Sequence, residues 1–299
     1  MKASGALKAV VMIFAFASIL PVEALAQSGA EFRRSGIMDG NLVQTVYGNW
    51  GVIGQPAQRG RRGAWIHPNN GYVGDVSVLV GAEVVAKVGT RDTTFHSVVV
   101  CPVDRPASGG PEQSPTGKRW GFEPVSGYFN AAQQEVAISN NPNSWPSFWP
   151  DRLDDASDPG WRGAWNGYFG RNQFNADLET YFVMDDNNDE EFNVTANNRW
   201  GVAFKPDARN PSRNGLGLEV RVRALQWNDV LAQDNIFWLY EITNQGTTNY
   251  SRVAFGSLVG TYVGVTSTED RREYDDDFSF FDVERDLTYT ADFDDNVAG

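Results

Sequence analysis

Strict alternation of apolar and charged residues marks the stretch Leu218-Glu219-Val220-Arg221-Val222-Arg223-Ala224. A period of two places the apolar side chains on one face of a β-strand and the charged side chains on the other. A second run has β-branched and aromatic residues at both parities of its first half, Ile236-Phe237-Trp238-Leu239-Tyr240-Glu241-Ile242-Thr243, which predicts a strand covered on both faces. After turn residues at 244–249, the segment 250–264 returns with further apolar side chains. We therefore expect a meander of three antiparallel strands, whose hydrophobic face requires a second layer.

The rest of the chain carries similar strand patterns. Further strands are predicted at residues 42–47, 75–88, 93–101, 178–184 and 199–204, with a hairpin turn at 89–92. Residues 131–140 are the only segment with a helical pattern, and a short helix is predicted there. The segments 54–74 and 102–117 are rich in Gly and Pro and are predicted to be loops. These patterns predict an all-β fold, with one or more antiparallel β-sandwiches and long Trp-, Gly- and Pro-rich loops.

The N-terminal residues have the pattern of a signal peptide. Lys2 and Lys8 precede the apolar run 9–20, and Ala24-Leu25-Ala26 places small residues at the two positions that a signal peptidase recognises. The apolar run is shorter than the roughly 20 residues that a membrane-spanning helix needs. We expect cleavage before Gln27 and an exported protein, extracellular or at the cell surface, with the periplasm as the alternative.

Four segments are expected along the chain. They are a signal peptide at 1–26, a flexible polar lead at 27–40, an N-terminal β region with Trp-rich loops at 41–175, and a C-terminal β-sandwich region with acidic loops at 176–299. The length after cleavage suits one large domain or two ordinary ones, and both remain open. Because the last residues have no feature of a natural terminus, we expect the chain to be part of a longer protein.

Composition restricts the partners. The formal net charge is −13 at pH 7, which argues against nucleic acid and anionic membranes and favours divalent cations. No segment after the signal peptide is long and apolar enough to be a transmembrane helix. Cys101 is the only cysteine, so an internal disulfide is impossible and stability must come from a core, bound metal, or both.

Carboxylates are concentrated in two places. The segment 269–295 holds twelve Asp and Glu side chains among aromatic residues, and a shorter acidic run covers 185–191. Oxygen ligands at alternate positions are typical of calcium loops, although both runs lack the glycine that an EF-hand has at its sixth position. The candidate metal ligands are Asp185, Asn187, Asp189, Asp292, Asp294 and Asn296. Two interpretations remain open: a solvated acidic surface, which we favour, and at least one bound calcium.

A segment rich in tryptophan, residues 141–175, also has two interpretations. Aromatic faces beside carboxylates and amides can stack on sugar rings, and indoles can equally fasten a long loop onto a sheet. We favour the second, because Pro and Gly between the aromatic residues indicate a loop pinned by them. The candidate ligand-binding residues are Trp145, Trp149, Trp161 and Trp165.

No catalytic residue is predicted. His67 and His96 are the only histidines, and the chain has no nucleophile elbow, paired-His zinc signature or phosphate loop. Cys101 follows three valines, which indicates a buried small hydrophobe rather than a nucleophile. Glycoside hydrolysis needs only two carboxylates and is the enzymatic alternative.

Several of these segments resemble a known group of proteins. Residues 72–83, 144–146, 181–186, 236–244 and 253–256 resemble large, uncharacterised exported proteins of Gram-negative bacteria, which often carry a C-terminal sorting domain. Residues 240–246 with Val253 are similar to the paired strands of immunoglobulin-like exported modules. The resemblance implies secretion or surface attachment and brings no catalytic chemistry with it.

The resulting hypothesis is an exported, non-catalytic β-rich structural or binding module of a larger cell-surface or secreted protein, with calcium as the candidate stabilising ion. Its expected partners are a glycan or other surface proteins. The alternative is a carbohydrate-binding or glycoside-hydrolysing protein that uses the Trp-rich loops and nearby carboxylates.

Overall fold

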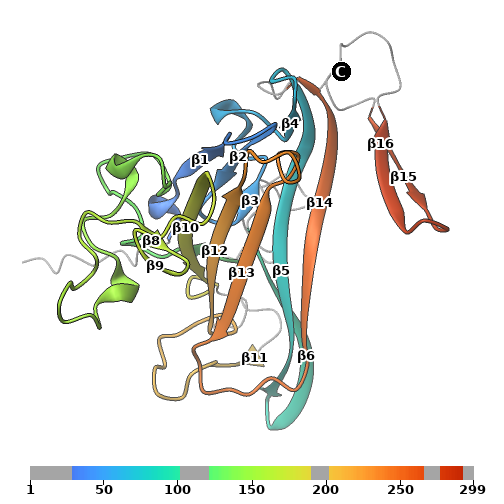
Figure 1. The fold of residues 1–299 in the computed structure, drawn as a ribbon. Coiled ribbons are helices and arrows are strands. Elements are labelled where there is room, and N and C mark those ends of the chain that lie inside the picture. Colours follow the sequence, from blue (N-terminus) through green and yellow to red (C-terminus); the bar gives the residue numbers. More distant parts are fainter. Residues whose placement is uncertain (1–28, 102–120, 190–201, 266–276, 292–299) are drawn as a thin grey trace, which may run out of the picture.

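The computed structural model describes residues 29–101, 121–189, 202–265 and 277–291, and within them the fold is all-β (Figure 1). Helical structure in these ranges is limited to single 3-10 turns: η1 (Ala30–Phe32), η2 (Ala57–Arg59), η3 (Pro142–Ser144) and η4 (Pro150–Arg152). None of the helices described is long and apolar enough to span a bilayer. The expected signal peptide lies outside the described residues.

An eight-stranded antiparallel sheet forms one layer. Its strands are β1 (Ser35–Met38), β2 (Val43–Gly48), β3 (Val52–Ile53), β4 (Ala64–Trp65), β5 (Asn70–Val88), β6 (Arg91–Val100), β11 (Val202–Ala203) and β14 (Val253–Val265). The 19-residue β5 organises this sheet, because it pairs with β3, β6, β11 and β14. The predicted hairpin is confirmed: Val88 pairs with Arg91 across a two-residue turn at which Gly89 has φ 62°.

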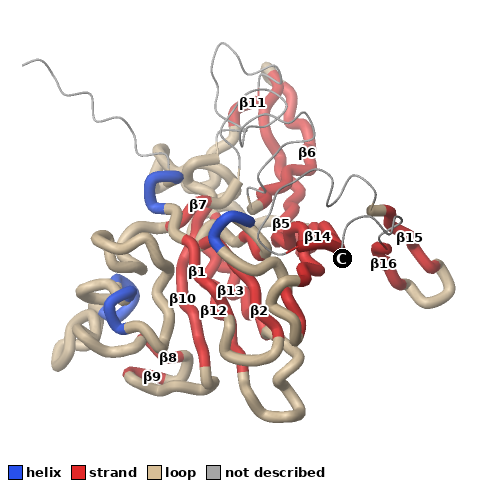
Figure 2. Tube along the Cα trace, turned by 90° about the horizontal axis from the view of Figure 1, so that it is seen from above, coloured by secondary structure: helices blue, strands red, loops and turns tan. Residues whose placement is uncertain are grey.

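A four-stranded antiparallel sheet forms the second layer, in the order β13-β12-β10-β7. Its strands are β7 (Glu123–Pro124), β10 (Leu178–Asp185), β12 (Leu218–Gln226) and β13 (Phe237–Asn244). The alternation in the first part of β12 has the predicted result, since Leu218, Val220, Val222 and Ala224 are all buried on one face. Two short hairpins complete the structure: β8 (Asn166–Gly167) with β9 (Gly170–Arg171), and β15 (Phe278–Asp282) with β16 (Leu287–Ala291). Seen from above, β15 and β16 lie apart from the two layers (Figure 2).

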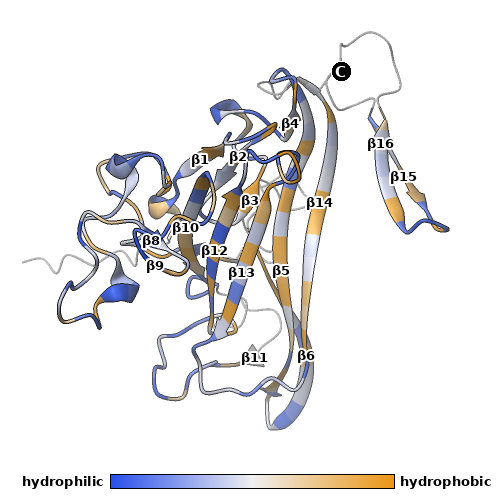
Figure 3. Ribbon diagram, viewed as in Figure 1, coloured by the Kyte–Doolittle hydropathy of each residue, from blue (hydrophilic) through white to orange (hydrophobic). Residues whose placement is uncertain are grey.

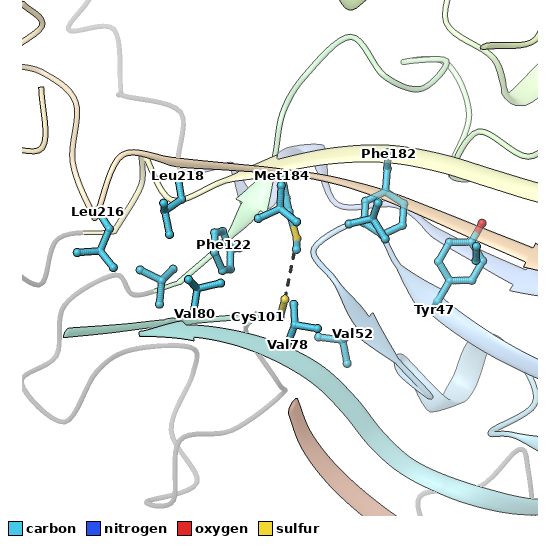
Figure 4. Packing of buried hydrophobic residues seen from close by; sticks show 14 of the residues in the cluster. Tyr47, Val52, Val78, Val80, Cys101, Phe122, Phe182, Met184, Leu216 and Leu218 are labelled. Carbon is cyan, nitrogen blue, oxygen red and sulfur yellow. Dashed lines mark hydrogen bonds between the residues drawn. The ribbon is translucent and has the colours of Figure 1, made fainter. Parts of the chain in front are cut away.

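The main hydrophobic core fills the space between the two sheets (Figure 4). Val78 and Val80 of β5 face Phe182 and Met184 of β10 across it. Cys101 is fully buried here, with its Sγ 3.9 Å from the Sδ of Met184. Burial raises the pKa of the Cys101 thiol to about 12, so this cysteine is a packing residue, as predicted.

The predicted meander is wrong at its third strand. β13 pairs with β12 as expected, but β14 crosses to the other layer and pairs with β5. The segment 245–252 between β13 and β14 crosses from one sheet to the other, and hydrogen bonds to distant residues hold it in place. Gln245 N donates to Gly217 O, and Thr247 N and Thr248 N both donate to Pro206 O. A local hairpin turn would have used acceptors within the segment itself.

The strand covered on both faces is β10, not β13. Every residue of β10 from Leu178 to Met184 is buried, whereas β13 lies at the sheet edge with half-buried or exposed side chains. The aromatic and β-branched composition of residues 236–243 indicated a strand correctly, but it contains no information on what covers each face.

Three local predictions also differ from the structure. Residues 131–140 are not helical, because Val136 N donates to Ser35 O and Ser139 N to Glu179 O in place of helical acceptors. The expected flexible lead contains strand β1, and the expected loop 54–74 contains β4 and the start of β5. Both larger sheets combine strands from either side of the expected boundary at residue 175.

Candidate functional site: the aromatic cap

The Trp-rich segment covers the outer face of the four-stranded sheet. We call residues 141–177 the aromatic cap; they lie on the side of β10 away from β5 and β14 (Figure 1). Successive side chains of a strand point to opposite faces, so Phe182 and Met184 enter the main core while Tyr181 and Val183 enter a second cluster under the cap. β10 is therefore buried between two hydrophobic layers.

Two of the four candidate tryptophans form the centre of this second cluster. Trp149 and Trp165 are fully buried, with their rings edge to face at 5.7 Å and 87°. Each indole N–H has an acceptor: Trp149 Nε1 donates to Ala164 O at 2.8 Å, and Trp165 Nε1 donates to Glu179 Oε2 at 2.8 Å. Neither ring presents a face to solvent, so both act as core side chains that fasten the cap to the sheet.

The other two candidates are half-buried at the cap surface. The ring of Trp145 lies 5.5 Å from that of Trp165, and its Nε1 donates to Ile138 O at 2.7 Å. Trp161 has a positive φ of 45°, and the guanidinium of Arg152 lies 4.5 Å from its ring centroid. The structure thus brings Trp145, Trp149 and Trp165 together, with Trp161 packed at the edge of the same cluster.

Two carboxylates beside the buried tryptophans, Glu179 and Asp151, are engaged in hydrogen bonds. Glu179 is fully buried and accepts from Trp165 Nε1 and from the backbone N–H groups of Asn175 and Ala176. Asp151 accepts from the hydroxyl of Tyr181 at 2.7 Å and from the side-chain amide of Asn166 at 3.0 Å. Both carboxylates are therefore held in fixed positions by the loop.

Arg223 is a buried cation on the face of β12 to which the sequence pattern assigned the charged side chains. Its guanidinium lies 3.9 Å from the ring centroid of Tyr181, and Nη1 donates to Asn166 O at 2.7 Å. Burial lowers the pKa of Arg223 and raises that of Tyr181. The alternation in β12 correctly excluded Arg223 from the main core, but the cap covers the outer face as well.

Four aromatic side chains that we did not single out as candidates are exposed at the cap: Phe148, Tyr168, Phe169 and Phe174. Phe169 is 77% exposed, and its ring meets that of Tyr168 edge to face at 5.0 Å. Phe174, also exposed, stacks over Trp165 with 7° between the ring planes. Their presence in residues 141–175 was visible in the sequence, but nothing there distinguished an exposed Phe from a buried Trp.

In the acidic run at the end of β10, residues 185–189, the side chains accept hydrogen bonds from backbone N–H groups. Asp185 Oδ1 accepts from Asn187 N at 3.0 Å, and Asp189 Oδ2 accepts from Gly121 N at 3.1 Å. Asn187 in turn accepts from Asn214 N at 3.2 Å. These three candidate metal ligands are thus close in sequence, but each side chain is directed to a different backbone segment.

Asp186, which we did not consider a candidate, is the most buried carboxylate of this run. Its two oxygens accept from Leu216 N at 2.6 Å and Leu218 N at 2.8 Å, and Arg213 lies 3.9 Å away. Burial raises the pKa of Asp186 to about 7 and also raises that of Asp185. Among the described residues, no three His, Cys, Asp or Glu side chains form a group that could hold a metal. Asp292, Asp294 and Asn296 lie outside the described residues.

Comparison of the chain with protein-family models, with curated proteins and with solved structures finds no match in any of the three.

Proposed function

We propose that this protein is an exported, non-catalytic β-rich module with a structural or binding role in a larger cell-surface or secreted protein. The observation that supports this proposal is the complete burial of Trp149 and Trp165. The indole N–H groups of Trp149 and Trp165 donate to the loop and to β10, respectively, so the Trp-rich segment packs against the sheet as part of the hydrophobic core. The neighbouring carboxylates, Asp151 and Glu179, are held by the same loop.

The test couples stability with ligand retention. Trp149→Phe should lower the free energy of unfolding in urea, because it leaves the carbonyl of Ala164 without its donor. Neither the wild type nor the variant should be retained on, or hydrolyse, a panel of insoluble polysaccharides. A wild type that binds or cleaves a polysaccharide, together with a folded Trp149→Phe variant that does not, would refute the structural role.

A second candidate function is glycan binding by exposed aromatic side chains of the cap, in particular Tyr168, Phe169 and Phe174. Exposed rings can stack on the apolar faces of sugars. Under this alternative, Phe169→Ala weakens polysaccharide retention in affinity electrophoresis. The matched control is Phe281→Ala, because Phe281 is an exposed aromatic residue on the separate β15–β16 hairpin.

We further propose calcium as a stabilising ion, on the basis of the carboxylate density at 185–191 and 269–295. Millimolar calcium should raise Tm by several degrees, magnesium should do so less, and a chelator should reverse the shift. Asp185→Ala with Asp189→Ala, and Asp292→Ala with Asp294→Ala, test the two sites separately. Sodium chloride at matched ionic strength is the control, and an equal shift in salt would leave only a solvated acidic surface.

A further inference from the structure

β14 is an edge strand of the eight-stranded sheet. Among the described strands it pairs only with β5, so the other edge of residues 253–260 has no described partner strand. Its thirteen residues include no charged residue and no proline, and Val253, Phe255 and Val259 are 61%, 56% and 60% exposed. Apolar colour runs along much of the strand (Figure 3). Natural proteins usually protect such edges with charges, prolines or a covering segment, because an open apolar edge is a template for another strand.

The hydrogen bonds to β5 determine which groups of β14 face the open edge. Glu83 N donates to Arg252 O at 3.1 Å, which makes Arg252 and Glu83 a hydrogen-bonded pair. In an antiparallel ladder such pairs recur at every second residue. Residues 252, 254, 256, 258 and 260 therefore direct their backbone groups to β5. The N–H and C=O groups of Val253, Phe255, Ser257 and Val259 point toward the open edge.

The same four residues share the core-side face of the sheet. They pair with Ala82, Val80, Val78 and Val76 of β5, in that order. The ring of Phe255 reaches Tyr240 of the opposite sheet at 6.2 Å. However, both β13 and β14 are edge strands, so the sandwich is open along this side and the apolar side chains of β14 remain half uncovered.

The regular part of β14 is self-complementary. The ladder with β5 is continuous from Val253 to Gly260 and becomes irregular after Gly260. A twofold axis at Gly256 would pair Val253 with Val259 of a second copy, and Ala254 with Leu258. The β-branched valines then lie opposite each other on one face, and two glycines meet at the axis. The hydrogen bonds from β14 to Thr290 of β16 and to Asp277, which precedes β15, are made by Thr261 and Val263, beyond the end of this register.

Charges at the ends of this register are also complementary. Arg252, whose side chain is 82% exposed and whose Nη1 lies 3.6 Å from Glu83 Oε2 of its own chain, would lie opposite Gly260 of the second copy. The carboxylate of Asp75 leans over Gly260, since a Cβ at that glycine would lie 2.7 Å from Asp75 Oδ1. All three residues are on the same face, so Arg252 of one copy reaches Asp75 of the other across a residue without a side chain. The symmetry provides this ion pair twice.

We propose that the protein forms a homodimer in which β14 pairs antiparallel with β14 of a second copy about a twofold axis at Gly256. The dimer joins two eight-stranded sheets into one continuous sheet and covers the open side of each sandwich. This proposal goes beyond the proposed module function and is independent of the role of the aromatic cap.

Sedimentation velocity of the purified protein between about 1 and 100 μM tests the dimer. The wild type should shift from monomer to dimer with concentration, and Val259→Lys should raise the dimer Kd by about tenfold or more because it places a charge at the pairing edge. Val85→Lys is the matched control, since Val85 is a 61% exposed valine in the same sheet, outside the part of β5 that pairs with β14. A monomeric wild type over the whole range, or equal weakening by Val85→Lys, would overturn the proposal.

Cross-linking tests the register without depending on a destabilising change. Residues 254 and 258 of two copies form a non-hydrogen-bonded pair with Cα atoms about 4.5 Å apart, which suits a disulfide. A mixture of the Ala254→Cys and Leu258→Cys variants should therefore oxidise to covalent dimers. Either variant alone should not, because like residues are offset by about 13 Å along the strands. Equal cross-linking by one variant alone would exclude this register.

A charge swap distinguishes a second copy from a foreign strand. Arg252→Glu should weaken the dimer, and adding Asp75→Arg should restore it, because the reversed pair is again complementary. Failure of the double variant to recover, with its circular dichroism spectrum unchanged, would contradict the ion pair on which the assignment of the occupant depends.

Discussion

Replacing Trp165 with Phe tests how the aromatic cap is held on the sheet. The substitution removes the only hydrogen-bond donor of the indole and keeps an aromatic ring in the cluster. Trp165 Nε1 donates to Glu179 Oε2 at 2.8 Å, and both residues are fully buried. The variant therefore leaves a buried carboxylate with two backbone donors, Asn175 N and Ala176 N.

The expected loss of stability has two contributions. A hydrogen bond to a charged group contributes about 1.5–3 kcal/mol, and no water replaces the donor at a site that is closed to solvent. The smaller ring leaves a cavity beside Trp149 and Phe174, which costs on the order of 1 kcal/mol. We expect the free energy of unfolding to fall by roughly 2.5–4 kcal/mol.

The assay is urea unfolding followed by far-ultraviolet circular dichroism, which does not depend on the substituted fluorophore. Trp145→Phe is the matched control, because it removes an indole from the same cluster that donates to a neutral acceptor, Ile138 O, at a half-buried position. That control should lose only about 1 kcal/mol. If the two variants lose equal free energy of unfolding, with equal m-values in urea, the hydrogen bond from Trp165 Nε1 to Glu179 has no special role.

Three further predictions follow from other parts of the structure. Val222→Asp should prevent folding or lower the free energy of unfolding by several kcal/mol, because it buries an unpaired charge between the sheets. Arg221→Asp, on the outer face, should have a mild effect. Equal effects of the two variants on thermal unfolding would contradict the register of β12. The free energy of unfolding should decrease as pH rises from about 4 to about 7, because of Asp186. The pKa of its carboxyl is about 7 in the folded protein and 3.8 in the unfolded chain, so between these values only the folded state keeps the carboxyl protonated. Urea titrations at several pH values should show a smaller loss in Asp186→Asn, and parallel pH profiles would oppose this assignment. N-terminal sequencing of exported protein should begin near Gln27, and an intact Met1 on cytosolic protein would remove the basis for export.

Local sequence pattern was sufficient for the elements that depend on near neighbours. The β5–β6 hairpin was predicted because its turn, Gly89 with Thr90, lies between two apolar runs, and both strands formed as expected. The alternation in residues 218–224 assigned the correct face to Val220 and Val222, because side chains in a strand alternate whatever its partner is. The all-β class followed from many such segments.

The candidate site was predicted only in part. The sequence located the Trp-rich segment and favoured packing over ligand binding, and Trp149 and Trp165 are buried. It did not identify Glu179 as their partner or Arg223 as a buried cation. Both assignments depend on the cap lying over the outer face of β10 and β12, which is a contact between segments far apart in the chain.

Strand partners were decided by tertiary structure alone. Period-two alternation defines two faces of a strand but does not say which neighbour pairs with each edge or what covers each face. β14 was predicted to pair with β13 because the two strands are consecutive in the sequence. It pairs instead with β5, and the partners Val253 and Ala82 are about 170 residues apart in the chain. The bonds from Thr247 and Thr248 to Pro206 O direct the chain to that layer, and no local propensity encodes an acceptor so distant. The sequence by itself therefore determined the longer strands and the faces of β12. Only the tertiary structure determined the sheets, because pairing depends on the backbone N–H and C=O groups that all residues except proline carry alike.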